Sequence, residues 1–206
     1  RALVRSYDPF VAAVDAAVSA AAGLGRGLPA LFGHSMGGAV ALSYALGRPE
    51  RVARLVFSAP YLVDARPRPA WMTALAGAVA AVAPRLPVAR LDAGGLSRDP
   101  RVGPAYTGDA LVHSGPVAAA TGHTLISSGA RLLADAPRLR VPTLVLHGEA
   151  DAIAGVEGSR ALARGAPAGT VELLTFPDAF HELHNEPERT GVPQRFTAAV
   201  LGFVAA

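Results

Sequence analysis

Cysteine and lysine are both absent from this 206-residue chain. Without cysteine, disulfide bonds play no part in the fold, and the redox state of the compartment is left open. The 19 basic residues are all arginines scattered without a basic run, and the net charge is only +3, so nucleic-acid binding has little support. What remains is a chain with the length of one domain and, at 51% hydrophobic residues, enough apolar material for a sizeable core.

The sequence GHSMGG at residues 33–38 is the most informative motif. The apolar run 29–32 before it predicts a strand, and the helix formers at 39–46 after it predict a helix. A strand, a tight turn and a helix in this order expose a serine hydroxyl to a histidine and direct a helix N-terminus at a developing oxyanion. We therefore predict that Ser35 is a nucleophile.

The same turn sets requirements on its neighbours. Side chains at positions 33 and 37 are expected to collide with the adjacent backbone, which would explain glycine at Gly33 and Gly37. The backbone N–H of Met36, directly after the serine, is the predicted oxyanion donor.

Partners for the serine follow in the C-terminal half. Residues 141–148 resemble a buried strand, and the turn after it ends on Asp151. A later strand at 171–176 leads to His181. Because ligands bind at the carboxyl ends of strands in an open α/β sheet, these side chains can converge with Ser35 there. His181 would then take the serine proton while Asp151 holds its imidazole in the correct tautomer.

The acid has alternative interpretations. Asp151 could cap the helix predicted to begin near residue 156. Glu149 lies close enough in sequence to compete for the role, and Asp64 follows the predicted strand 54–58. The order Ser, Asp, His along the chain favours Asp151.

The histidines also raise the question of a metal site. A zinc-binding H-E-x-x-H pattern needs its second histidine four positions after the first, but His184 follows His181 by only three. We therefore predict neither a metal nor a cofactor. Four further histidines lack a catalytic context and are expected to be ordinary hydrogen-bonded residues: His34, His113, His123 and His147.

These motifs together resemble the monoacylglycerol lipase and lysophospholipase branch of the α/β-hydrolase fold. The resemblance covers nearly the whole chain and rests on GHSMGG, on HGEAD at 147–151, on AFHELHNE at 179–186, on LSRDP at 96–100 and on VEGS at 156–159. It implies a mostly parallel, doubly wound sheet with a helical cap insertion. One departure is Gly155, where such bacterial lipases commonly carry proline.

A larger departure lies at the front of the chain. In the family, several strands and a histidine-glycine oxyanion loop precede the nucleophile by far more than the 34 residues available before Ser35. We therefore expect an N-terminally truncated fold that lacks those strands. Its first element would be a helix opened by Asp8-Pro9, with Phe10, Val14 and Val18 on one face.

The chain is expected to divide into two core segments, 1–60 and 125–206, around a cap insertion at 61–124. Prolines accumulate in this insertion, as expected for a cap and not for a sheet. Its charge-free segment 70–83 is too short to cross a bilayer, so it is either a buried cap helix or an apolar lid that touches lipid or lines an acyl pocket. Further helices are predicted at 117–134, 156–164 and 192–206.

The resemblance implies a serine ester hydrolase that cleaves monoacylglycerols or related single-chain lipid esters through an acyl-enzyme. Its partners would be the lipid ester and, transiently, a membrane surface, with a cytoplasmic or membrane-peripheral location. Two alternatives stay open at this point. One is a carboxylesterase or peptidase on the same scaffold, and the other is an inactive fragment or binding protein.

Overall fold

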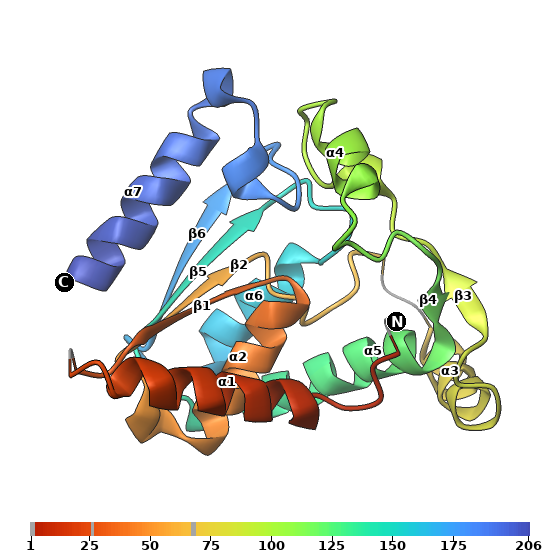
Figure 1. Ribbon diagram of the computed structural model, residues 1–206, viewed down its shortest axis with the longest axis horizontal. Coiled ribbons are helices and arrows are strands. Elements are labelled where there is room, and N and C mark those ends of the chain that lie inside the picture. Colours follow the sequence, from red (N-terminus) through yellow and green to blue (C-terminus); the bar gives the residue numbers. More distant parts are fainter. Residues whose placement is uncertain (1–2, 26, 67–68) are drawn as a thin grey trace.

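The computed structural model describes residues 3–25, 27–66 and 69–206 (Figure 1). Its centre is a four-stranded, all-parallel sheet with the strand order β1-β2-β5-β6. The strands are β1 (Ala30–His34), β2 (Arg54–Ser58), β5 (Thr143–Gly148) and β6 (Val171–Phe176). This arrangement confirms the predicted α/β class with a parallel sheet.

Helices cover both faces of the sheet. Figure 1 shows α1 (Asp8–Ala22), α2 (Met36–Gly47), α5 (Ala119–Ala134) and α6 (Val156–Gly165) on one side and α7 (Val192–Ala205) on the other. Short 3-10 helices connect these elements at Pro49–Arg51, Ala93–Gly95, Ala136–Arg138, Leu183–Asn185 and Glu188–Thr190. The sheet is therefore doubly wound, as predicted.

The core divides into two layers at the sheet. Successive side chains of a strand point to opposite faces, so Leu55 and Phe57 pack toward α2 while Val56 packs toward α7. Every residue of β5 is buried, which explains why its residues 144–146 are apolar without alternation. The two central strands, β2 and β5, thus contribute side chains to the core on both faces of the sheet.

The first helix uses a different face from the one predicted. Val18 is buried and Val14 packs against the same cluster, as expected, but Phe10 is 37% exposed. Val11 takes its place against the core. Positions 11, 14 and 18 follow the i, i+3, i+7 spacing of a helix face. The buried face of α1 therefore includes residue 11 in place of the predicted residue 10.

The insertion is not purely helical. It contains α3 (Ala70–Val82), α4 (Val102–Gly108) and a small antiparallel pair formed by β3 (Pro87–Ala89) and β4 (Val117–Ala118). The pairing of β4 explains why α5 begins at Ala119 and not at residue 117 as predicted. A boundary at residue 124 would fall inside α5, and the division into segments remains a prediction.

One face of α3 is covered and the other is open. Gly77 lies against the ring of His123 on α5, where an added Cβ would be 3.1 Å from His123 Cε1. Trp71, Leu75 and Val82 are 66%, 56% and 88% exposed. The segment is therefore not a buried helix. Among the described residues, no helix is long and apolar enough to cross a membrane.

Candidate active site

Ser35 lies on a strained turn between β1 and α2. Its φ of 54° and ψ of −122° are rarely adopted by residues other than glycine. Hydrogen bonds to neighbouring segments hold this conformation. The Ser35 N–H donates to Ser58 O at 3.0 Å, and Ser35 O accepts from the N–H groups of Gly38 and Tyr61, both at 3.0 Å.

The glycines around the serine have unequal roles. A Cβ added to Gly33 would lie 2.6 Å from the carbonyl oxygen of Gly37, and one added to Gly38 would lie 2.8 Å from Cβ of Pro60. At Gly37, in contrast, an added Cβ meets nothing within 4 Å. The expectation of crowding therefore holds for Gly33 but is wrong for Gly37. Gly38 is the second crowded position.

Met36 is the first residue of α2. The first N–H groups of a helix have no intrahelical acceptor, and the helix dipole makes this end electropositive. The Met36 N–H is therefore suited to bind an anion beside Ser35, as predicted, but its role as oxyanion donor remains a prediction.

Asp151 and His181 lie side by side at the same edge of the sheet. Asp151 follows β5 and His181 follows β6, and because these strands are parallel, both side chains emerge at their carboxyl ends. Asp151 Oδ2 is 2.6 Å from His181 Nδ1, and both side chains are almost completely buried. The structure therefore brings the predicted acid and the predicted base into contact.

The environment of Asp151 keeps it ionised. Its Oδ1 accepts from the N–H groups of Ile153 at 2.8 Å and Ala154 at 3.0 Å. Burial opposes ionisation, but hydrogen bonds from His147 and His181 outweigh it and hold the pKa of Asp151 well below its usual range. A carboxylate that stays charged can stabilise an imidazolium next to it.

The two alternative acids have other contacts. Glu149 is exposed and pairs with Arg160 at 3.0 Å. Asp64 Oδ1 accepts the N–H of Arg66 at 3.0 Å, and its backbone forms a bridge with Ala154. The carboxylate beside His181 Nδ1 is that of Asp151.

His34, next to Ser35, packs against the predicted base. Its ring centroid is 4.7 Å from that of His181 and 5.6 Å from that of His184, and its Nδ1 is 3.2 Å from Ser58 Oγ. Burial, together with His181 and His184, lowers the pKa of His34 to about 3. The His34 ring, next to Ser35, is therefore neutral at neutral pH.

The remaining histidines differ from one another. His147 is hydrogen-bonded as expected, but it also lies 3.3 Å from Asp151 Oδ2, a contact that the sequence does not reveal. His113 is exposed. His123 Nδ1 is buried and has no hydrogen-bond partner among the described residues, so the expected hydrogen bond is absent at this nitrogen. Within the described part of the chain, no three His, Asp or Glu side chains gather as a metal site.

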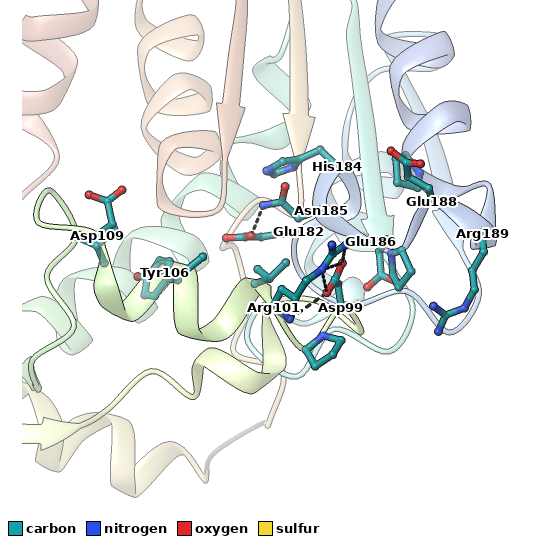
Figure 2. Close-up of a pocket in the computed structure, with 16 residues that line it drawn as sticks. Asp99, Arg101, Tyr106, Asp109, Glu182, His184, Asn185, Glu186, Glu188 and Arg189 are labelled. Atoms are coloured by element: carbon teal, nitrogen blue, oxygen red, sulfur yellow. Dashed lines mark hydrogen bonds and ion pairs between the residues drawn. The ribbon is translucent and has the colours of Figure 1, made fainter.

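A cleft of about 1040 Å³, lined by both polar and apolar residues, borders this edge of the sheet (Figure 2). One wall comes from α4 and the residues before it, including Asp99, Arg101 and Tyr106, and the other from the segment 182–193 that follows His181. His184 lies on this second wall. The cleft therefore begins one residue beyond the predicted base.

The parallel sheet, the strained serine turn and the buried acid and histidine together define an α/β-hydrolase. The chain belongs to the family described as "Serine aminopeptidase, S33", whose model matches residues 1–188. Within that family it belongs to the monoacylglycerol lipase-like branch predicted from the motifs, and hence to the carboxylic ester hydrolases.

Three relatives illustrate the similarity. The chain is 35% identical over 202 residues to a monoacylglycerol lipase of Mycolicibacterium smegmatis, covering 98% of this chain and 72% of the relative. It is 34% identical over 168 residues to the human monoglyceride lipase, covering 80% of this chain and 55% of the relative. The crystal structure of a monoacylglycerol lipase of Paleococcus ferrophilus superposes with a TM-score of 0.85 at 31% identity, covering 99% of this chain and 76% of that one. The chain thus spans just over half the length of the human relative and about three quarters of the other two.

Proposed function

We propose that this protein hydrolyses monoacylglycerols or related single-chain lipid esters through an acyl-enzyme formed on Ser35. The observation that carries the proposal is the 2.6 Å contact between Asp151 Oδ2 and His181 Nδ1 at the strand edge where Ser35 lies on its strained turn. The Mycolicibacterium and human relatives, which are named for monoacylglycerol hydrolysis, support the substrate class.

The reaction begins with attack of Ser35 Oγ on the ester carbonyl. Since His181 Nδ1 is occupied by Asp151, its Nε2 takes the serine proton and then donates it to the departing glycerol oxygen. The Met36 N–H stabilises the oxyanion. Water, activated by the same nitrogen, then cleaves the acyl-enzyme and releases the fatty acid. No cofactor takes part in these steps.

The open face of α3 supports a lipid substrate. Trp71, Leu75 and Val82 expose apolar surface on a helix that carries no charged residue. Such a face is suited to contact a micelle or membrane surface from which a monoacylglycerol is taken. Lipid contact through α3 is therefore part of the proposal.

An aminopeptidase activity is the second candidate, because the matching family carries that description. A substrate panel separates the two. The unmodified full-length protein is assayed with a long-chain monoacylglycerol in micelles, with a short soluble ester and with an aminoacyl amide, and Ser35→Ala serves as the blank. We expect kcat/KM for the monoacylglycerol to exceed that for the amide by at least about tenfold, a difference of ~1.4 kcal/mol in transition-state binding. Faster turnover of the amide would overturn the lipase proposal.

A further inference from the structure

His147 contacts the predicted catalytic acid without belonging to the Ser35, His181 and Asp151 set. It lies in β5, four positions before Asp151, and its side chain is completely buried. A buried imidazole is costly unless both ring nitrogens are satisfied, so its contacts define what it can do.

The two ring nitrogens of His147 face different chemistry. Nε2 lies 3.0 Å from the carbonyl oxygen of Ala154 and 3.3 Å from Asp151 Oδ2, and both of these atoms are acceptors. Nε2 must therefore carry a hydrogen. Nδ1 lies 2.7 Å from the hydroxyl of Ser159 on α6, and this hydroxyl can donate to it. Ser159 thus supports the tautomer that has its hydrogen on Nε2.

We propose that His147, held by Ser159, is a positioning residue that shares its Nε2 hydrogen between the Ala154 carbonyl oxygen and the same Asp151 oxygen that receives the hydrogen bond of His181. This inference rests on the proposed function. Oδ1 of the carboxylate is fixed by the N–H groups of Ile153 and Ala154, so His147 supplies the second fixed contact on the Oδ2 side. With both oxygens held, the carboxylate cannot rotate, and the plane of the His181 ring follows from it.

Two amide substitutions of His147 test whether the hydrogen-bond donor must lie at the position of Nε2. In His147→Gln the amide nitrogen can occupy the place of Nε2, whereas in His147→Asn it lies nearer the place of Nδ1. The readouts are the rate at which a fluorophosphonate labels the serine and the kcat and KM for a short soluble ester. We expect His147→Asn to lower the labelling rate and kcat by on the order of tenfold with KM unchanged, and His147→Gln to stay within about threefold of the unmodified protein.

Ser159→Ala provides an independent test of the same chain of contacts. It should lower kcat several-fold by releasing the His147 tautomer, and it should add no further loss in a His147→Gln background, because glutamine has no tautomer to select. If His147→Asn distorts the fold, the Ser159→Ala comparison and the downfield NMR signal of the His181 Nδ1 proton still report on the triad.

Equal activity of the two amide variants would overturn the inference, since a purely packing role does not depend on where the donor lies. Additive losses for Ser159→Ala and His147→Gln would also overturn it. Failure of the proposed function gives different results. Without an acyl-enzyme mechanism the unmodified protein would not be labelled on Ser35 at all, and with a different substrate class it would be labelled but would turn over the aminoacyl amide faster than the monoacylglycerol.

Discussion

Oε2 of Glu186 lies 2.5 Å from Nε of Arg98, and the Glu186 side chain is completely buried. Its other oxygen accepts the N–H of Phe180 at 3.0 Å, directly before His181. Ser97 donates to Asn185 O at 2.7 Å in the same region. The Arg98–Glu186 ion pair therefore connects the LSRDP segment at 96–100 to the loop that carries the predicted base, His181.

Because of this ion pair, we expect substitutions of two nearby arginines to have very different effects on the free energy of unfolding. Arg98→Met leaves the buried Glu186 carboxylate unpaired and should lower the free energy of unfolding by about 3 kcal/mol. Arg101→Met is the matched control, because Arg101 also pairs with a carboxylate, that of Asp99, but is 88% exposed and should change stability little. Urea denaturation measures both variants. Equal stability of the two would contradict a structural role for the Arg98–Glu186 pair.

The sequence predicts the elements of the sheet better than their side-chain contacts. Residues 54–58 and 171–176 form β2 and β6 as predicted, because each is a short segment rich in apolar residues. The β3–β4 pair could not be predicted, since strands of two or three residues show no periodicity. The contact of His147 with Asp151 depends on how the turn between them folds back, which spacing along a strand does not reveal.

The two glycines beside the serine should respond differently to alanine. Gly33→Ala forces a Cβ to within 2.6 Å of a backbone oxygen that cannot move aside, so we expect a loss of at least about 2 kcal/mol in unfolding free energy. Gly37→Ala meets open space in the first turn of α2 and should be neutral or stabilising by up to about 1 kcal/mol. Thermal or urea denaturation gives the comparison. A destabilised Gly37→Ala would restore the original expectation of crowding.

The lowered pKa of His34 predicts that the folded protein loses stability as the pH falls. The unfolded chain protonates this residue near its ordinary pKa of 6.5, whereas the folded protein does so only near a pKa of about 3. Between these values the unfolded state binds more protons, so the free energy of unfolding falls as the pH falls, by at most about 1.4 kcal/mol per pH unit from this group. His34→Gln should weaken this dependence, and His113→Gln, at an exposed position, should not. Identical pH profiles for His34→Gln and the unmodified protein would contradict the account.

The exposed face of α3 predicts a selective effect on lipid substrates. Leu75→Arg should lower kcat/KM for a micellar monoacylglycerol by about tenfold, because a leucine buried in lipid contributes about 1.5–3 kcal/mol, and should leave a short soluble ester unaffected. Leu201→Arg on α7 is the control, since Leu201 is 64% exposed and α7 lies at the opposite end of the molecule from α3 (Figure 1). Equal losses on both esters would show that the change acts on the fold and not on lipid contact.

The identity of the nucleophile tests the central proposal most directly. The full-length protein is treated with a fluorophosphonate, digested, and analysed by mass spectrometry to locate the modified residue. We predict one adduct on Ser35, the residue held at a φ of 54° between β1 and α2, and no adduct in Ser35→Ala. An adduct on a different serine, or labelling that continues unchanged in Ser35→Ala, would contradict the proposed mechanism.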